Sequence, residues 1–176
     1  MPLLTLRVPE PADAEGLLAA VRESLGELYP WMDWCHPDFS RSDALRWISS
    51  QPQARETGSA FEFLIVGEQG RLLGCCGLNN INPRLRLANL GYWVRTSETG
   101  RGVATQAVTD IARWAFVHTD LERLEIVAAV ANAASQAVAA KAGALREGVL
   151  RSRLHVHGQF QDAVMHSIVR PRPPTA

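Results

Sequence analysis

Two glycines separated by one residue constrain the fold of this chain more than any other feature. They lie in the segment Thr99–Thr105, between an apolar, aromatic run from Leu90 to Arg95 and a periodic helical segment. Because glycine lacks Cβ, Gly100 and Gly102 allow close backbone approach and dihedral angles that other residues avoid. Free N–H groups and the helix dipole at the first turn then favour an anion. The pattern predicts a strand–turn–helix unit that binds a diphosphate.

Two common phosphate motifs do not fit this segment. A P-loop requires Lys and then Ser or Thr after its second glycine, where Val103 and Ala104 stand. A dinucleotide fingerprint requires a third small residue at the position of Thr105, and an acidic residue after a second strand. A tight turn before a helix also uses glycines for conformational reasons alone. Spacing by itself leaves that alternative open.

Composition indicates a small globular enzyme. A chain of 176 residues suits one domain, which we expect over residues 1–170, with a frayed proline-rich tail at 171–176. Lys plus Arg and Asp plus Glu balance at 18 each, so no basic field favours nucleic acid or an anionic membrane. Apolar runs are shorter than a membrane span and no secretory signal is visible. The odd cysteine count, with Cys75 and Cys76 adjacent, favours free thiols and a cytoplasmic location.

Hydrophobic periodicity predicts an α/β fold with about seven strands flanked by helices. Strands are expected at 4–8, 62–67, 71–78, 88–95, 124–130, 150–157 and 161–169. Helices are expected from 11 to about 25, at 42–49 with Ser40 or Ser42 as cap, at 102–118, and at 135–141 with Gly143 at C′. Two hairpins are expected, around Gly70 and around Gly158.

Three separated segments together resemble the GNAT superfamily of acyl-CoA-dependent N-acetyltransferases. They are Leu90–Arg95, Thr99–Thr105, and Asn132–Ser135 with Val138, Lys141 and Gly143. The Asn-rich run from Asn79 to Pro83 is similar to the branch that contains the ribosomal-protein N-terminal acetyltransferases. The resemblance implies a GNAT fold, α/β in class, with a central, mostly antiparallel mixed sheet splayed between its fourth and fifth strands. Thr99 departs from the Gln or Arg that usually opens the pyrophosphate motif.

The resemblance also implies where acetyl-CoA, the co-substrate, binds. Its diphosphate is expected on the amides of the glycine segment, and its pantetheine arm in the gap between the splayed strands. Asn132 would bind a pantetheine amide, and Lys141 either contacts a phosphate or complements the C-terminus of its helix. The full expected set is Trp93, Val94, Arg95, Gly100, Arg101, Gly102, Val103, Ala104, Thr105, Asn132, Ser135 and Lys141.

Transfer to an amine requires a base, an oxyanion donor and an acid for the leaving thiolate. The resemblance implies the N–H of Val94 as the oxyanion donor. Ala139 stands where many members carry a tyrosine acid, and Ser135 is the substitute in the resembled branch. Ser135 could instead only cap its helix. The base is left open between His155, with its neighbour His157, and a water chain to Asn79 or to backbone carbonyls. Because no third ligand recurs at metal spacing, we expect no metal.

The segment after the first helix is expected to form the acceptor side. Trp31, Asp33 and Trp34 offer aromatic faces and a carboxylate to an ammonium, although aromatic residues at a helix end also pack into cores. Asn79 and Tyr92 complete the expected acceptor residues. The adjacent Cys75 and Cys76 are expected to act as small core hydrophobes.

These features predict an N-acetyltransferase that moves an acetyl group to a primary amine by direct attack in a ternary complex. The acceptor is either a protein N-terminal α-amine or a small-molecule amine, and a homodimer is left open. The alternative is a CoA-binding regulatory or structural protein with impaired catalysis. The missing tyrosine, the missing acid at Asn89 and the departure at Thr99 keep that alternative open.

Overall fold

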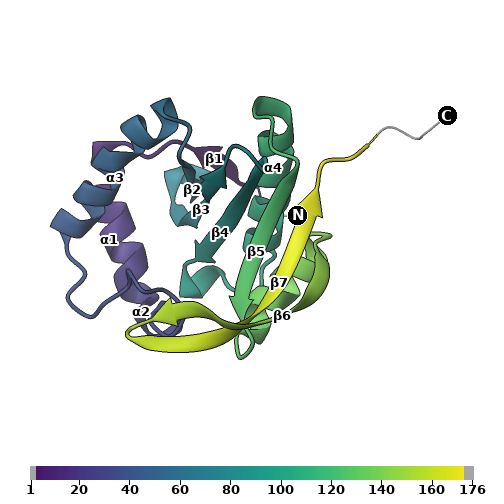
Figure 1. The fold of residues 1–176 in the computed structure, drawn as a ribbon. Helices are drawn as coiled ribbons and strands as arrows, with labels where there is room; N and C mark the ends of the chain where they lie inside the picture. The colour runs from purple at the N-terminus through teal and green to yellow at the C-terminus, as the bar shows by residue number, and fades with distance from the viewer. Residues whose placement is uncertain (1–2, 173–176) are drawn as a thin grey trace.

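The protein, in a computed structural model that describes residues 3–172, is built on one seven-stranded sheet (Figure 1). Its strand order is β1-β2-β3-β4-β5-β7-β6. Only β4 and β5 run parallel, and the other neighbours are antiparallel. The strands are β1 (Thr5–Arg7), β2 (Phe61–Val66), β3 (Leu72–Asn82), β4 (Leu87–Val94), β5 (Arg123–Ala129), β6 (Leu145–Val156) and β7 (Gln159–Val169). The predicted fold class and strand number are confirmed. Residues 173–176 of the expected tail lie outside the described part.

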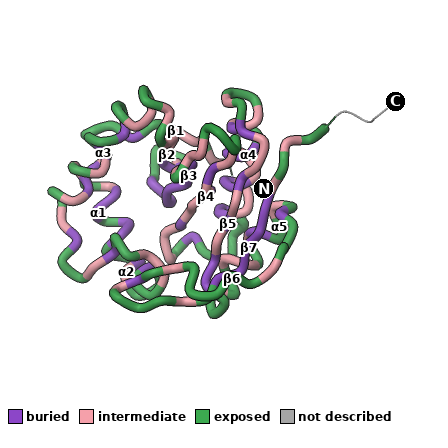
Figure 2. Tube along the Cα trace, viewed as in Figure 1, coloured by how far each residue is buried: buried purple, intermediate pink, exposed green. Residues whose placement is uncertain are grey.

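Helices cover both faces of the sheet (Figures 1 and 2). One face packs on α1 (Ala14–Glu23) and α3 (Arg41–Glu56), with the short α2 (Leu25–Leu28) at the end of α1. The other packs on α4 (Val103–His118) and α5 (Ala133–Lys141). Short 3-10 turns are η1 (Pro11–Asp13), η2 (Glu68–Gly70) and η3 (Thr96–Glu98).

The apolar face predicted for α4 is the buried one. Its members are Ala104, Ala107, Val108, Ile111 and Ala115. This stripe packs on the sheet because it repeats with the helical period. It fixes the start of α4 beside the end of β4, where the glycine segment lies.

Three helices differ from the prediction, and the shortest of them, α5, begins at Ala133 and not at Ser135. The helix expected at 42–49 continues to Glu56 through Pro52, since packing of Ile48 and Gln51 outweighs the donor that proline removes. Ser40 caps this helix in a capping box with Asp43, which confirms one of the two expected caps. The first helix breaks at Ser24, whose buried hydroxyl accepts a hydrogen bond from the N–H of Thr96 at 3.0 Å.

The last hairpin turns at Gly158 as predicted, but β6 begins at Leu145 and not at Leu150. β6 is one of the two edge strands, and its residues up to Leu150 are almost all exposed. Its pairing with β7 also shifts register near Gly148 and after Leu150. Exposure on both faces and these irregularities remove the alternation on which a sequence prediction depends.

Candidate active site

β4 and β5 separate in the middle of the sheet. They pair at Leu87–Arg123, Ala88–Leu124 and Asn89–Glu125, and no further, although both strands continue. A cavity of about 230 Å³, the smaller cavity, is lined there by Leu90 to Tyr92 of β4 and by Ile126, Val127 and Ala129 of β5. The predicted splay is therefore present, and it leaves backbone groups of β4 without a strand partner on that side.

The N–H of Val94 faces the open side of β4. The next N–H, that of Arg95, donates to Leu73 O on β3 at 2.7 Å. Because successive residues of a strand direct their backbone groups to opposite edges, the N–H of Val94 points towards β5. This is the orientation that an oxyanion donor in the splay would need.

The glycine segment forms the turn between η3 and α4. Gly100 and Gly102 have φ of 73° and 81°, so both lie in the left-handed region that favours glycine. The first intrahelical bond runs from Gln106 N–H to Gly102 O at 3.0 Å. The preceding N–H groups, those of Val103, Ala104 and Thr105, therefore lack intrahelical acceptors at a positive helix end. This backbone fits a diphosphate.

The side chains of two expected cofactor residues are already paired. Glu98, only 5% exposed, contacts Arg71 at 3.1 Å and Arg101 at 2.9 Å. Arg95 contacts Glu23 at 2.7 Å and also donates to Leu72 O. These arginines stabilise the loop through ion pairs, which leaves the amides as its main anion-binding groups. The expected Lys141 is exposed in the last turn of α5.

Asn132, and not Ser135, caps α5, so the capping interpretation of Ser135 is wrong. The side chain of Asn132 accepts the N–H of Ser135 at 3.0 Å. The Ser135 hydroxyl lies 3.0 Å from the Tyr92 hydroxyl, which itself donates to Ser135 O at 2.8 Å. Since that bond uses the tyrosine proton, the serine hydroxyl is the donor of the pair. Burial raises the pKa of Tyr92 to about 12, so this pair stays protonated at neutral pH.

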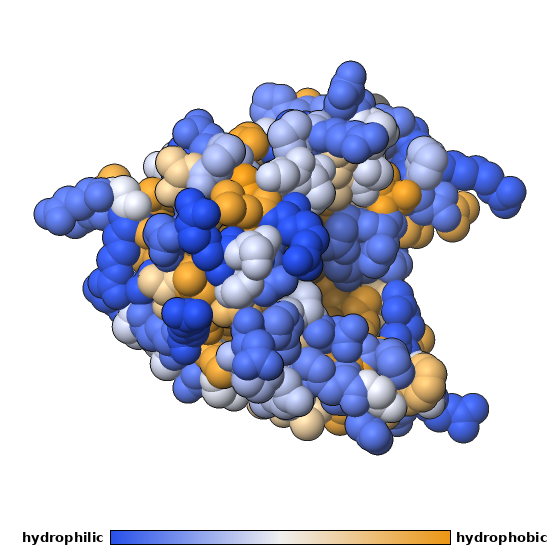
Figure 3. Space-filling view, turned by 90° about the vertical axis from the view of Figure 1, so that its left-hand side faces the viewer, coloured by the Kyte–Doolittle hydropathy of each residue, from blue (hydrophilic) through white to orange (hydrophobic). Residues whose placement is uncertain are grey.

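A larger cavity, of about 730 Å³, lies between the sheet and the helices α1 and α3. Aromatic and sulfur-containing side chains form much of its wall, namely Met32, Trp34, Phe39, Trp47 and Trp93. From the side of α3 the surface is hollowed, and hydrophobic side chains are visible inside the hollow (Figure 3). Asn89, Gly91 and Tyr92 also line the smaller cavity, so the two cavities meet along β4.

The floor of the larger cavity contains a carboxylate that sequence reasoning missed. Glu62 of β2 pairs with Gly77 of β3, which pairs with Gly91 of β4. We call these three residues the glycine row. A Cβ at Gly77 would overlap the Glu62 carboxylate, so this side chain extends across Gly77 in the direction of Gly91. A single charged residue in the otherwise apolar strand Phe61–Val66 is the signal that could have identified it.

Two asparagines orient this carboxylate. Asn89 donates to Asn79 at 2.9 Å, and Asn79 donates to Glu62 Oε1 at 3.1 Å. Burial raises the pKa of Glu62, and the hydrogen bond and the nearby Arg55 only partly oppose this effect. The structure thus places the expected Asn79 and Tyr92 on the larger cavity.

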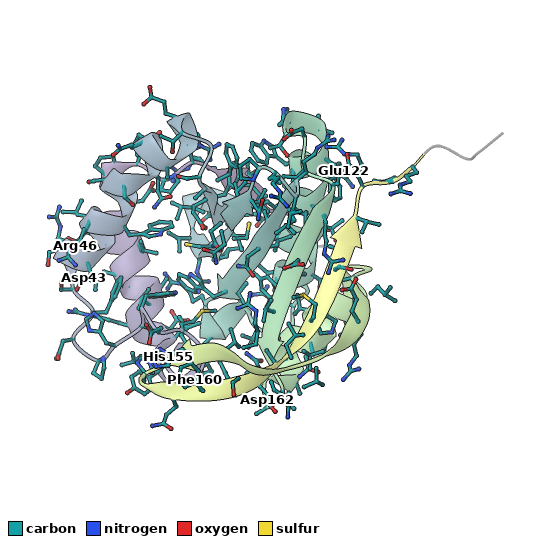
Figure 4. The ribbon with its side chains drawn as sticks, viewed as in Figure 1. Asp43, Arg46, Glu122, His155, Phe160 and Asp162 are labelled. Carbon is teal, nitrogen blue, oxygen red and sulfur yellow. The ribbon has the colours of Figure 1, made fainter. Side chains whose placement is uncertain are left out.

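The other expected acceptor and base residues are spread apart. Trp34 lines the larger cavity and Trp31 the smaller one, whereas Asp33 accepts the N–H of His157 at 2.8 Å. His155 is exposed and its ring lies 4.7 Å from that of Phe160 (Figure 4). Its neighbours Leu154 and Val156 line the smaller cavity, so His155 projects from the opposite face of β6.

Among residues 3–172 we find no cluster of three or more metal-ligating side chains, and no helix long and apolar enough to cross a membrane.

Comparison with known proteins agrees with this architecture. The family model described as "Acetyltransferase (GNAT) domain" matches residues 4–145. The "Putative ribosomal N-acetyltransferase YdaF" of Bacillus subtilis is 31% identical over 95% of this chain and 91% of its own. The "Ribosomal-protein-serine acetyltransferase" of Escherichia coli is 27% identical over 77% of this chain and 75% of its own. The structure of Mycobacterium smegmatis RimJ in complex with CoA-disulfide is 26% identical, with a TM-score of 0.88 over 99% of this chain and 86% of the other. The chain belongs to the GNAT family of acetyltransferases.

Proposed function

We propose that this protein transfers the acetyl group of acetyl-CoA to a primary amine by direct attack in a ternary complex. The observation that carries the proposal is the path from the splay of β4 and β5 into the larger cavity, beside the end of β4 that leads through the glycine segment into α4. The path offers an anion site at one end, a slot for an amide-bearing arm, and a separate chamber for the acceptor.

Each residue of the path has an expected role. The amides of the glycine segment bind the diphosphate, and the free edge of β4 pairs with the pantetheine arm. The N–H of Val94 stabilises the oxyanion as the amine attacks the thioester carbonyl. The Ser135–Tyr92 pair then gives a proton to the departing thiolate. The names of relatives that act on ribosomal proteins support a protein N-terminal α-amine as one acceptor. The three cysteines, all free thiols, support a reducing cytoplasm.

A thiol-release assay with acetyl-CoA and a panel of amines tests this function. We expect release of free CoA that depends on the amine, and mass spectrometry should find the acetyl group on the acceptor nitrogen. Binding of acetyl-CoA without amine-dependent release would favour the alternative of a CoA-binding protein with impaired catalysis. Failure to bind acetyl-CoA would contradict both.

Ser135→Ala should lower kcat by about 10²-fold, because the leaving thiolate loses its proton donor. Tyr92→Phe should give a smaller loss, since its hydroxyl accepts from the Ser135 hydroxyl and so orients it. Isothermal calorimetry should find the affinity of both variants for acetyl-CoA unchanged.

Asn132→Ala serves as the contrasting variant. Loss of the helix cap should reduce the free energy of unfolding by about 1 kcal/mol, and loss of the amide contact should weaken acetyl-CoA binding. If the Ser135→Ala protein kept the kcat of the native protein across the pH range, Ser135 would not be the proton donor to the thiolate.

A further inference from the structure

The larger cavity has an unusual combination of lining groups. Its wall is mostly apolar and aromatic, whereas its floor holds the half-buried carboxylate of Glu62. Among the described residues, the Glu62 carboxylate has no ion pair. The guanidinium of Arg55 donates to the backbone oxygen of Glu62 and stacks over the Phe63 ring. A carboxylate in such surroundings costs folding free energy. Its presence despite that cost points to a functional role.

The glycine row leaves space beside this carboxylate. An added Cβ at Gly91 would lie 3.8 Å from the nearest atoms, the side-chain nitrogens of Asn79 and Asn89. The space above Gly91 is therefore open and borders polar side chains, at the point where the two cavities meet. A nitrogen atom placed over Gly91 would have the Glu62 carboxylate on one side and the splay of β4 and β5 on the other.

We propose that the larger cavity is the acceptor site, that it takes a primary amine whose adjacent carbon skeleton is apolar or aromatic, and that Glu62 receives the proton of its ammonium. This inference rests on the proposed function and adds to it the substrate class and the base. The apolar body packs among Trp34, Trp47 and Phe39, and the nitrogen lies over Gly91.

The protons balance over the whole transfer. The ammonium gives one proton to the Glu62 carboxylate, and the free amine forms a C–N bond to the thioester carbonyl carbon. The C–S bond then breaks, and the Ser135 hydroxyl turns from Tyr92 and gives its proton to the departing thiolate. The second proton of the nitrogen returns to the Ser135 oxygen through solvent, which restores the serine hydroxyl. Glu62 returns its proton to solvent, so each turnover yields an amide, a thiol and one proton.

The charges around Glu62 support its role as a base. Arg55 lies behind it on α3, while Cys75 and Cys76 line the same cavity as neutral thiols, because burial raises the pKa of both. The other titratable groups that line the cavity are His36 from the loop before α3, Tyr92 from β4, and two residues of α3. The two from α3 are Asp43 and Arg46, which lie side by side on that helix (Figure 4). Asp43 is paired with Arg46 at 3.1 Å and also bonds the Ser40 hydroxyl. The remaining groups thus leave Glu62 as the free carboxylate at the floor.

The same lining discriminates between amines. A second ammonium on the acceptor would find no unpaired carboxylate in this lining, because Glu62 already serves the first ammonium and Asp43 is paired with Arg46, and burial of such a charge is costly. We therefore expect polyamines to be poor acceptors. 2-Phenylethylamine and a peptide that begins with phenylalanine both carry a primary amine close to an aromatic ring. They differ in the peptide chain, which would extend out of the cavity.

Glu62→Gln tests the base. It keeps the shape of the side chain and the acceptor atom for Asn79, but it cannot take a proton. We expect kcat with 2-phenylethylamine to fall by 10²-fold or more, and the acidic limb of the pH profile, which reflects the raised pKa of Glu62, to disappear. Glu68→Gln, an exposed site on η2, is the matched control and should leave both unchanged.

Thermal unfolding of the same variant gives an independent readout. A raised carboxyl pKa means that the folded state binds the proton more tightly, so ionisation above pH 4.5 destabilises the fold. Glu62→Gln removes that penalty and should raise Tm at pH 7–8 relative to Tm at pH 4, where the native carboxyl is protonated. A lower Tm of the variant at pH 7–8 would mean that the ionised carboxylate stabilises the fold, which contradicts the destabilising charge that the proposal assigns to it.

The acceptor class is tested by kinetics with 2-phenylethylamine, a phenylalanine peptide and spermidine. Trp34→Ala should raise KM for the aromatic acceptors about tenfold and leave KM for acetyl-CoA unchanged. Phe160→Ala, at an exposed aromatic residue that lines neither cavity, is the control and should leave both KM values unchanged. Higher kcat/KM for the peptide than for the free amine identifies a protein N-terminus as the source.

The outcomes separate the two proposals. No acetyl transfer to any amine contradicts the proposed function. Transfer in which Glu62→Gln keeps the kcat and pH profile of the native protein contradicts only the inference about Glu62. Preference for spermidine over both aromatic acceptors overturns the assigned substrate class.

Discussion

Gly102→Val should weaken the binding of acetyl-CoA by about 10- to 100-fold. Gly102 precedes α4 with φ of 81°, a conformation that a β-branched residue resists. The substitution should turn or obstruct the amides that face the diphosphate, and one charged hydrogen bond contributes about 1.5–3 kcal/mol. Isothermal calorimetry with acetyl-CoA measures the loss.

Gly58→Val is the matched control for backbone strain. Gly58 follows α3 with φ of 66° and has open space around it, so this variant should lose stability but keep its affinity. Arg101→Ala should weaken binding less than Gly102→Val, because its guanidinium is held by Glu98. Unchanged affinity for acetyl-CoA in a folded Gly102→Val protein would mean that the glycine segment is only a tight turn before the helix and does not bind the diphosphate.

The sequence predicted the half of the site that depends on backbone conformation. Glycines before a periodic helix, and apolar runs of strand length, are local signals. They correctly located the turn at Gly102 and the start of α4, whereas the splay between the fourth and fifth strands was implied by the family resemblance. The fold class could also be predicted, because the strands with one buried face alternate clearly.

The other half depends on partners from distant parts of the chain. Glu62, Asn79 and Asn89 form a hydrogen-bonded chain only because β2, β3 and β4 pair in one register. Likewise, the bond from Tyr92 to Ser135 spans 43 positions. The start of β6 was missed for a related reason, since an exposed edge strand has no buried face to generate a pattern.

Gly77→Ala should lower kcat/KM for the amine by about 10²-fold, although the residue contacts neither substrate in our proposal. Its new methyl group would overlap the Glu62 carboxylate, which is the far end of a flexible side chain and therefore moves away while β3 stays in place. The displaced carboxylate would no longer face Gly91, so the ammonium loses its proton acceptor. Steady-state kinetics in both substrates, with calorimetry for acetyl-CoA, should find cofactor affinity unchanged.

A double-mutant cycle with Glu62→Gln makes this prediction specific. If Gly77→Ala acts through the carboxylate, it should cost little further activity in the Glu62→Gln protein, and the two losses should be far from additive. Gly148→Ala, on β6 with open space around it, controls for a methyl group added to a strand. Full activity in Gly77→Ala would mean that the carboxylate need not lie across the glycine row. Additive losses would mean that Gly77→Ala acts by distorting β3 and not through the Glu62 carboxylate.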